Sequence, residues 1–175
     1  LIDKSKELDT PLAINISLST NDGAHNGSSL LEQYISTIAA IERVTIVIAA
    51  GNEGEAAHHV GGNLEGINEI FFNVSSDEST VVLNLYKSLL PSVSIELISP
   101  SGGSTGEIAV KEGFQEGAIG NSRYSIYLTG PKPFDVSGEI GIIIRGINEY
   151  ITPGQWKISL RKLNNYDGTF DMWLP

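Results

Sequence analysis

The sequence has no cysteine and a single methionine in 175 residues. Without thiols, disulfide bonds, cysteine-ligated zinc and thiol catalysis are excluded, while the redox compartment stays open. Long hydrophobic runs are also missing, since the apolar run around Ile46 is far too short to cross a bilayer. Basic residues are few, 11 against 21 acidic ones, and a formal charge of −10 argues against a nucleic-acid surface.

The remaining composition is that of a globular protein, with 41% hydrophobic and 18% charged residues. The chain begins at Leu1 rather than at a methionine, and it stops directly after a strand-like segment ending in Pro175. We therefore expect the chain to be a piece cut from a longer protein.

The first 65 residues predict a strand, a helix and a second strand. Residues 12–18 and 44–48 are apolar runs, and we expect the second strand to be buried on both faces. Between them, Ser29 and Glu32 have the spacing of a helix capping box. The helix has one apolar face, formed by Leu31, Tyr34, Ile35, Ile38 and Ala39. This order predicts a parallel βαβ unit whose strands both end at the same sheet edge.

From about residue 67 onward the sequence shows only strand patterns. Apolar residues alternate with polar ones in five segments that include Ile140, Ile142 and Ile144. Turn-forming clusters such as residues 99–103 separate these segments. The pattern predicts about eight short strands in an antiparallel β-sandwich. The expected fold is thus α/β plus all-β, with domains at 1–65 and 66–175 and a loop at residues 55–66.

The segment Ala49-Ala50-Gly51-Asn52-Glu53-Gly54 directly follows the second predicted strand. Small residues and a glycine allow another backbone to approach closely, and Asn52 presents an amide donor just past the strand end. A donor held on a rigid strand can stabilise an oxyanion that develops on a scissile carbonyl. The alternative is a turn asparagine with a left-handed backbone.

This segment resembles the oxyanion-hole segment of the subtilisin-like serine peptidases, and Ile14–Ser19 resembles their substrate-binding strand. The resemblance implies that Ser17, Leu18 and Ser19 bind the substrate backbone. It implies that Ala49, Ala50 and Gly51 line the S1 pocket, with Glu53 near its base. Asn52 would be the oxyanion donor. Many members of the family have a glycine at the position of Ser19, so we expect the rim of the S1 pocket to differ from theirs.

Strands in the second half resemble the jelly-roll of subtilase accessory domains. These strands come directly after the segment that contains Asn52. That order resembles clostridial spore-germination subtilases, whose catalytic domain carries an inserted jelly-roll. The implied partner is a protein or peptide substrate, and the implied source is bacterial, spore-associated or secreted. The family's catalytic Asp, His and Ser motifs are not found in the sequence, so the chain alone is expected to be inactive. The alternatives are a pseudopeptidase scaffold and a free-standing binding β-sandwich.

Other polar residues have weaker signals. His25 lies in a segment that resembles a catalytic histidine motif but follows the wrong strand, so we expect it to have a loop role. His58 and His59 are adjacent, and their side chains should point apart. We therefore expect a loop role for them as well and no metal site. A structural calcium ion could use Asp22, Glu53, Glu55 and Glu65, although no calcium-loop pattern is present; no other cofactor is expected. Exposed apolar edges in the first domain predict dimerisation of the isolated chain.

Overall fold

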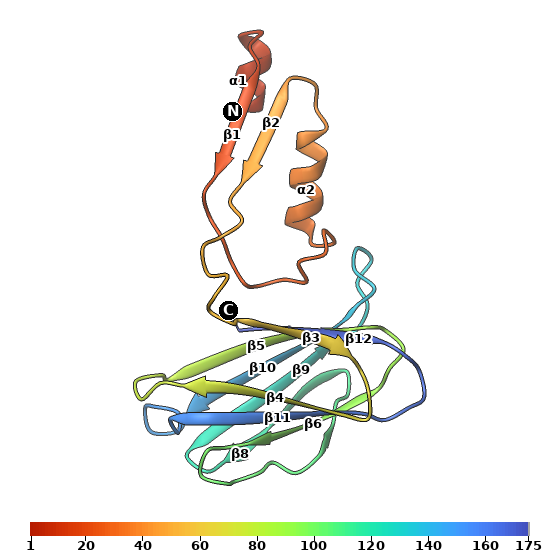
Figure 1. The fold of residues 1–175 in the computed structure, drawn as a ribbon. Coiled ribbons are helices and arrows are strands. Elements are labelled where there is room, and N and C mark those ends of the chain that lie inside the picture. Colours follow the sequence, from red (N-terminus) through yellow and green to blue (C-terminus); the bar gives the residue numbers. More distant parts are fainter. Residues whose placement is uncertain (175) are drawn as a thin grey trace. The chain divides into compact units, whose positions relative to one another are not determined.

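The computed structural model describes residues 1–174, which form two compact units, the first at Leu1–Ala57 and the second from His58 onward. Figure 1 shows a first unit of helices and two strands, and a second unit made of strands. Each unit is described by itself below.

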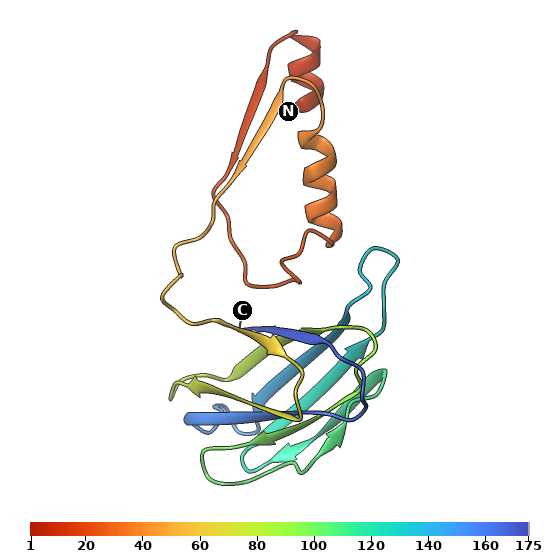
Figure 2. The ribbon, with the colours of Figure 1, turned by 45° about the vertical axis from the view of Figure 1, so that its right-hand side comes forward.

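The first unit contains α1 (Ile2–Glu7), β1 (Leu12–Ile16), α2 (Leu30–Ala39) and β2 (Val44–Ile48). The strands β1 and β2 pair in parallel, with Leu12 opposite Val44, and α2 lies beside them (Figures 1 and 2). The capping box at the start of α2 is confirmed: the Ser29 hydroxyl accepts from the Glu32 N–H at 3.2 Å, and the Ser29 N–H donates to the Glu32 carboxylate at 3.0 Å.

The prediction that the second strand is buried on both faces is wrong. Val47 and Ile48 in β2 are 56% and 51% exposed, and no residue among positions 1–57 is buried. The reason is that α2 covers only one face of the strand pair. On that face Ile14, Ile46 and Ile35 line an apolar hollow. The first unit therefore lacks a hydrophobic core of its own.

The second unit consists of two antiparallel sheets. The six-stranded sheet has the order β3 (His59–Asn63), β12 (Thr169–Trp173), β5 (Thr80–Lys87), β10 (Gly138–Gly146), β9 (Ser122–Thr129) and β8 (Gly113–Ile119). The four-stranded sheet has the order β4 (Ile67–Val74), β11 (Gly154–Lys162), β6 (Val93–Ile98) and β7 (Ile108–Ala109). All neighbouring strands in both sheets pair antiparallel.

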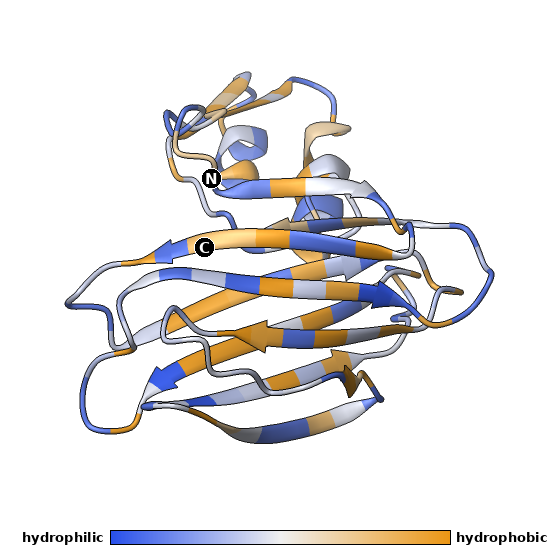
Figure 3. Ribbon diagram, turned by 60° about the horizontal axis from the view of Figure 1, so that its bottom comes forward, coloured by the Kyte–Doolittle hydropathy of each residue, from blue (hydrophilic) through white to orange (hydrophobic). Residues whose placement is uncertain are grey.

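Buried residues of the two sheets form one hydrophobic core. Many of them are the apolar residues that alternate with polar ones in the sequence. Ile140, Ile142 and Ile144 of β10 are fully buried, and so is Trp156 of β11. Figure 3 shows orange and blue residues alternating along several of these strands. The indole N–H of Trp156 donates to the carbonyl of Thr152 at 2.8 Å, which satisfies its only polar atom. This tryptophan is therefore part of the core.

The structure differs from the sequence prediction at residues 55–66. Residues His59–Asn63, expected in a loop, form β3 and pair with β12, so the two compact units meet between Ala57 and His58 rather than after residue 65. All five residues of β3 are exposed and two are glycines, so the strand carries no apolar alternation. Strands β7 and β8 likewise lack a strong alternation of apolar and polar residues. The sequence therefore predicted about eight strands where the structure has ten.

Candidate functional site

The segments that follow β1 and β2 lie together at the carboxyl end of the parallel strand pair. The Ala49 N–H donates to the Ile16 carbonyl at 3.0 Å, which extends the pairing past the ends of both strands. A Cβ placed on Gly51 would lie 4.0 Å from the Cβ of Ser19. The expected proximity of residues 17–19 and 50–52 is therefore confirmed. It follows from the parallel pairing, because both strands end at the same edge.

The chain turns at Gly51, whose φ of +81° lies in the left-handed region that favours glycine. The next residue, Asn52, is exposed, and within residues 1–174 its side-chain amide makes no hydrogen bond. An amide with two unused N–H donors at a strand end can donate to an oxygen atom of a bound molecule. Glu53 is held differently, since its carboxylate accepts from the Asn21 amide at 3.4 Å.

Residues 17–19 present an open backbone beside this turn. Leu18 is 79% exposed, and in the described part of the chain neither Leu18 nor Ser19 makes a backbone–backbone hydrogen bond. The Ser17 hydroxyl accepts from the Asn15 amide at 2.9 Å, which fixes the side chain at the end of β1. The N–H and C=O groups of this segment are thus available to pair with an extended peptide.

The loop between β1 and α2 is organised by polar contacts. The two ring nitrogens of His25 lie 2.9 Å from the Gly23 carbonyl and 3.3 Å from the Thr20 carbonyl. This arrangement fits the loop role expected for His25. Hydrogen bonding to Ser29 lowers the pKa of the Glu32 carboxyl, with smaller contributions from the backbone of Ser29 and Gly27.

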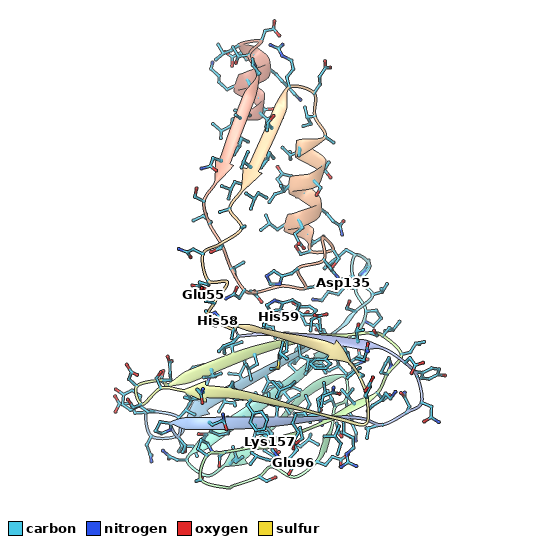
Figure 4. The ribbon with its side chains drawn as sticks, in the orientation of Figure 1. Glu55, His58, His59, Glu96, Asp135 and Lys157 are labelled. Carbon is cyan, nitrogen blue, oxygen red and sulfur yellow. The ribbon has the colours of Figure 1, made fainter. Side chains whose placement is uncertain are left out.

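His59 has a defined environment that the sequence did not indicate. Its Nε2 lies 3.0 Å from the Asp171 carboxylate, and its ring stacks on Trp173 with centroids 4.6 Å apart. The three residues come from β3, which is the edge strand of the six-stranded sheet, and from its neighbour β12; Figure 4 labels His59. Since His59 and Asp171 are far apart in sequence, only the strand register reveals this cluster. The structure thus replaces the expected loop role of His59 with a position in a strand.

The carboxylates considered for calcium do not converge with other ligands. Within residues 1–174 no group of three or more His, Asp or Glu side chains is placed to hold a metal ion. No helix in the same range is long and apolar enough to span a membrane.

Comparison with known proteins finds a similarity among solved structures. No protein-family model matches the chain, and no curated protein matches it significantly. Among solved structures, the chain is similar to the CspB protease of Clostridium perfringens, with 50% sequence identity and a TM-score of 0.96. The match covers all of this chain and 38% of that protease. The chain therefore closely resembles part of a protease, which supports a protease-related function.

Proposed function

We propose that the chain is the substrate-binding and oxyanion-stabilising part of a longer subtilisin-like serine endopeptidase of the clostridial spore-germination type. The observation that carries the proposal is that the unused Asn52 amide directly follows Gly51, whose Cβ position lies 4.0 Å from Ser19 in the open segment 17–19. The proposal is further supported by the similarity to a protease that is more than twice as long as this chain.

In this mechanism, the rest of the longer protein supplies a serine nucleophile and a histidine base oriented by an aspartate. The serine oxygen forms a bond to the peptide carbonyl carbon while the histidine takes the hydroxyl proton. The negative charge then develops on the carbonyl oxygen, and the Asn52 Nδ2–H donates to it together with a backbone N–H. When the C–N bond breaks, the histidine returns the proton to the leaving amine. This chain alone holds the donor but not the nucleophile, so it is inactive by itself.

The substrate peptide binds as an added strand. Its backbone pairs antiparallel with Ser17, Leu18 and Ser19, whose backbone hydrogen-bonding groups are open. The substrate side chain that fills the S1 pocket enters between this segment and residues Ala49–Gly51, with Glu53 near the base of the pocket. Ser19 adds a hydroxymethyl group to the rim, close to Gly51.

The second unit is an inserted jelly-roll domain in this proposal. His58 and Leu174 lie side by side, because the Leu174 N–H donates to the His58 carbonyl at 2.9 Å. Adjacent ends are what a domain needs in order to interrupt another domain without separating the flanking segments. The longer catalytic domain would enter and leave the insertion at this point.

The test is fluorophosphonate labelling of the full-length protease and of its Asn52→Ala variant. We expect the parent to be labelled at one serine, and peptide turnover in the variant to fall by about 10²–10³, as for loss of one oxyanion donor. Asn165→Ala is the matched control, because Asn165 is exposed in the second unit and its side chain makes no hydrogen bond within residues 1–174. Its labelling and turnover should equal those of the parent.

If a correctly folded and matured parent is not labelled at all, the peptidase proposal is wrong. The remaining explanation is then a pseudopeptidase that keeps the fold as a binding scaffold. Labelling with unchanged turnover in Asn52→Ala would retain the protease and reject the role of Asn52.

A further inference from the structure

Two arginines on the six-stranded sheet face each other without an acidic partner. Arg145 of β10 is directly opposite Arg123 of β9 in the strand register, and both are exposed. Within residues 1–174 neither guanidinium forms an ion pair or a hydrogen bond. The other two arginines do have partners: Arg43 lies 2.6 Å from Asp9 and Arg161 lies 3.6 Å from Glu107.

This placement is unfavourable for the protein alone. Like charges directly opposite each other on neighbouring strands destabilise the pair. The chain has 21 acidic residues and a net charge of −10, so carboxylates that could neutralise this pair are abundant in the sequence. None lies within ion-pair distance of either guanidinium in the described chain. An anion from outside the chain would remove the repulsion.

The two arginines line a hollow of about 780 Å³ together with the hydroxyl residue Ser125. Two glycines on the wall of the hollow pack closely against tyrosine residues. A Cβ on Gly117 would lie 2.4 Å from the Tyr124 hydroxyl oxygen, and one on Gly146 would lie 2.4 Å from the backbone of Tyr150. Larger residues at these positions would require neighbouring atoms to move, so the wall of the hollow is closely packed at both glycines.

We propose that this hollow binds an oxyanion, a phosphate or a carboxylate group carried by a small organic molecule or an acidic peptide side chain. Guanidinium groups present paired N–H donors that match the oxygens of both anions, and the Ser125 hydroxyl is a further donor on the same wall. The volume is larger than an inorganic ion needs and falls in the range of small-molecule pockets, roughly 300–1,000 Å³. Ile147 also lines the hollow and is 46% exposed, so it offers apolar contact to the organic part.

One carboxylate in the hollow opposes anion binding and provides a further test. Glu116 of β8 lines the same wall, opposite Ser125 in the register. Its negative charge repels an incoming anion, so Glu116→Gln should strengthen binding while the arginine variants weaken it. An effect of net charge alone would make substitution of a remote arginine weaken binding as much as substitution of Arg123 or Arg145, so a remote arginine variant separates the two explanations.

The experiment uses the 175-residue chain, with inorganic phosphate and glutarate as probes at constant ionic strength and chloride as the reference. Binding is measured from chemical-shift changes in two-dimensional amide NMR spectra, and thermal unfolding is measured in parallel. We expect saturable shifts confined to β8, β9 and β10. Arg145→Gln and Arg123→Gln should each weaken binding at least tenfold, and Glu116→Gln should tighten it severalfold. Arg161→Gln is the matched control, since it removes one arginine from the other sheet and should leave binding unchanged.

The arginine variants should also change the thermal unfolding of the chain when chloride is the only anion present. Because the repulsion is relieved, Arg145→Gln should unfold at the same or a higher temperature than the parent chain, and the anion should then raise only the parent's midpoint. Binding of phosphate alone would identify a phosphate ligand, and binding of glutarate would identify a carboxylate ligand. If neither probe produces saturable shifts, or if Arg161→Gln weakens binding as much as Arg145→Gln, the proposal is wrong.

Discussion

Lys87 is a buried charged residue whose environment contains carbonyl oxygens rather than a carboxylate. It is only 8% exposed, and its ammonium group donates to the carbonyls of Ser88, Leu89 and Pro91 at 3.1, 3.4 and 2.6 Å. Gly138 allows this approach, because a Cβ there would lie 3.3 Å from the Lys87 Nζ. The lysine thus ties the turn after β5 to the end of the strand.

Replacing Lys87 with methionine keeps the apolar stem and removes the donor from three carbonyls. We expect the free energy of unfolding to fall by about 1–3 kcal/mol, the cost of leaving buried polar groups without partners. Urea unfolding followed by tryptophan fluorescence measures this, since Trp156 and Trp173 both lie in the second unit. Lys111→Met is the control at an exposed lysine and should change stability little. Equal effects of the two substitutions would show that the carbonyl contacts of Lys87 contribute nothing.

The same residue predicts a pH dependence. Burial lowers the pKa of Lys87 below its ordinary value of 10.5, so in the alkaline window below 10.5 the unfolded chain binds more protons than the folded chain. The contribution of this group to stability therefore increases as the pH rises through its folded-state pKa. The difference in unfolding free energy between the parent and Lys87→Met should grow with pH in that window. A difference that stays constant or shrinks would contradict the lowered pKa.

At the level of residues, the sequence revealed what depends on local order and missed what depends on strand register. Asn52 could be singled out because small residues and a strand precede it directly. Trp156 could be placed in the core because it alternates with Ile158 and Leu160, which are fully buried. In contrast, the contacts of His59 and the pairing of Arg123 with Arg145 arise only when distant strands align.

Among the elements, α2 depends most clearly on a local signal. Ser29→Ala removes the N-cap acceptor and should destabilise the helix by about 1 kcal/mol. Amide hydrogen exchange at Glu32 and Gln33 should then accelerate about fivefold relative to the parent, because 1 kcal/mol corresponds to that factor. Ser36→Ala, at an exposed position within the same helix, is the control and should not accelerate exchange. Unchanged exchange in Ser29→Ala would mean that the capping box does not hold the first turn.

The capping box also links the helix to pH. Because the pKa of Glu32 is lowered in the folded chain, its contribution is fully present above the ordinary value of 4.5 and is lost as the pH falls through the folded-state pKa. In an NMR titration, Glu32 of the parent should titrate below 4.5. Its pKa should rise in Ser29→Ala, where the hydroxyl that lowers it is missing. A Glu32 pKa that is identical in the two proteins would contradict this cause.

The elements of the second unit were predicted where hydrophobic residues alternate and missed where they do not. Strands β10 and β11 were evident from their buried isoleucines, whereas β3 is defined only by hydrogen bonding to β12. The error at β2 has a different origin. A continuous apolar run predicts burial on both faces, but a sequence window does not show how many neighbours cover the strand.

For the whole molecule, the two units differ in what stabilises them. All buried hydrophobic residues of the described chain lie in the second unit, from Leu64 to Met172. We therefore expect residues 58–175 to unfold cooperatively as an isolated polypeptide, and residues 1–57 to remain without a cooperative transition. Thermal unfolding followed by circular dichroism of each piece measures this. A cooperative transition in residues 1–57, or its absence in residues 58–175, would contradict the assignment of the core.

The hydrogen bond from the Leu174 N–H to the His58 carbonyl has a mechanical consequence. Strands β3 and β12 are antiparallel neighbours, so in the proposed insertion the two connections of the second unit leave from the same end of one strand pair. A force that pulls these connections apart acts along the hydrogen bonds and loads them one after another, as in opening a zipper. The Leu174–His58 hydrogen bond bears that load first, and the Trp173–His59 pair with its stacked rings bears it next. Tension between the connections should therefore peel β3 away from β12 before it disturbs the rest of the sheet.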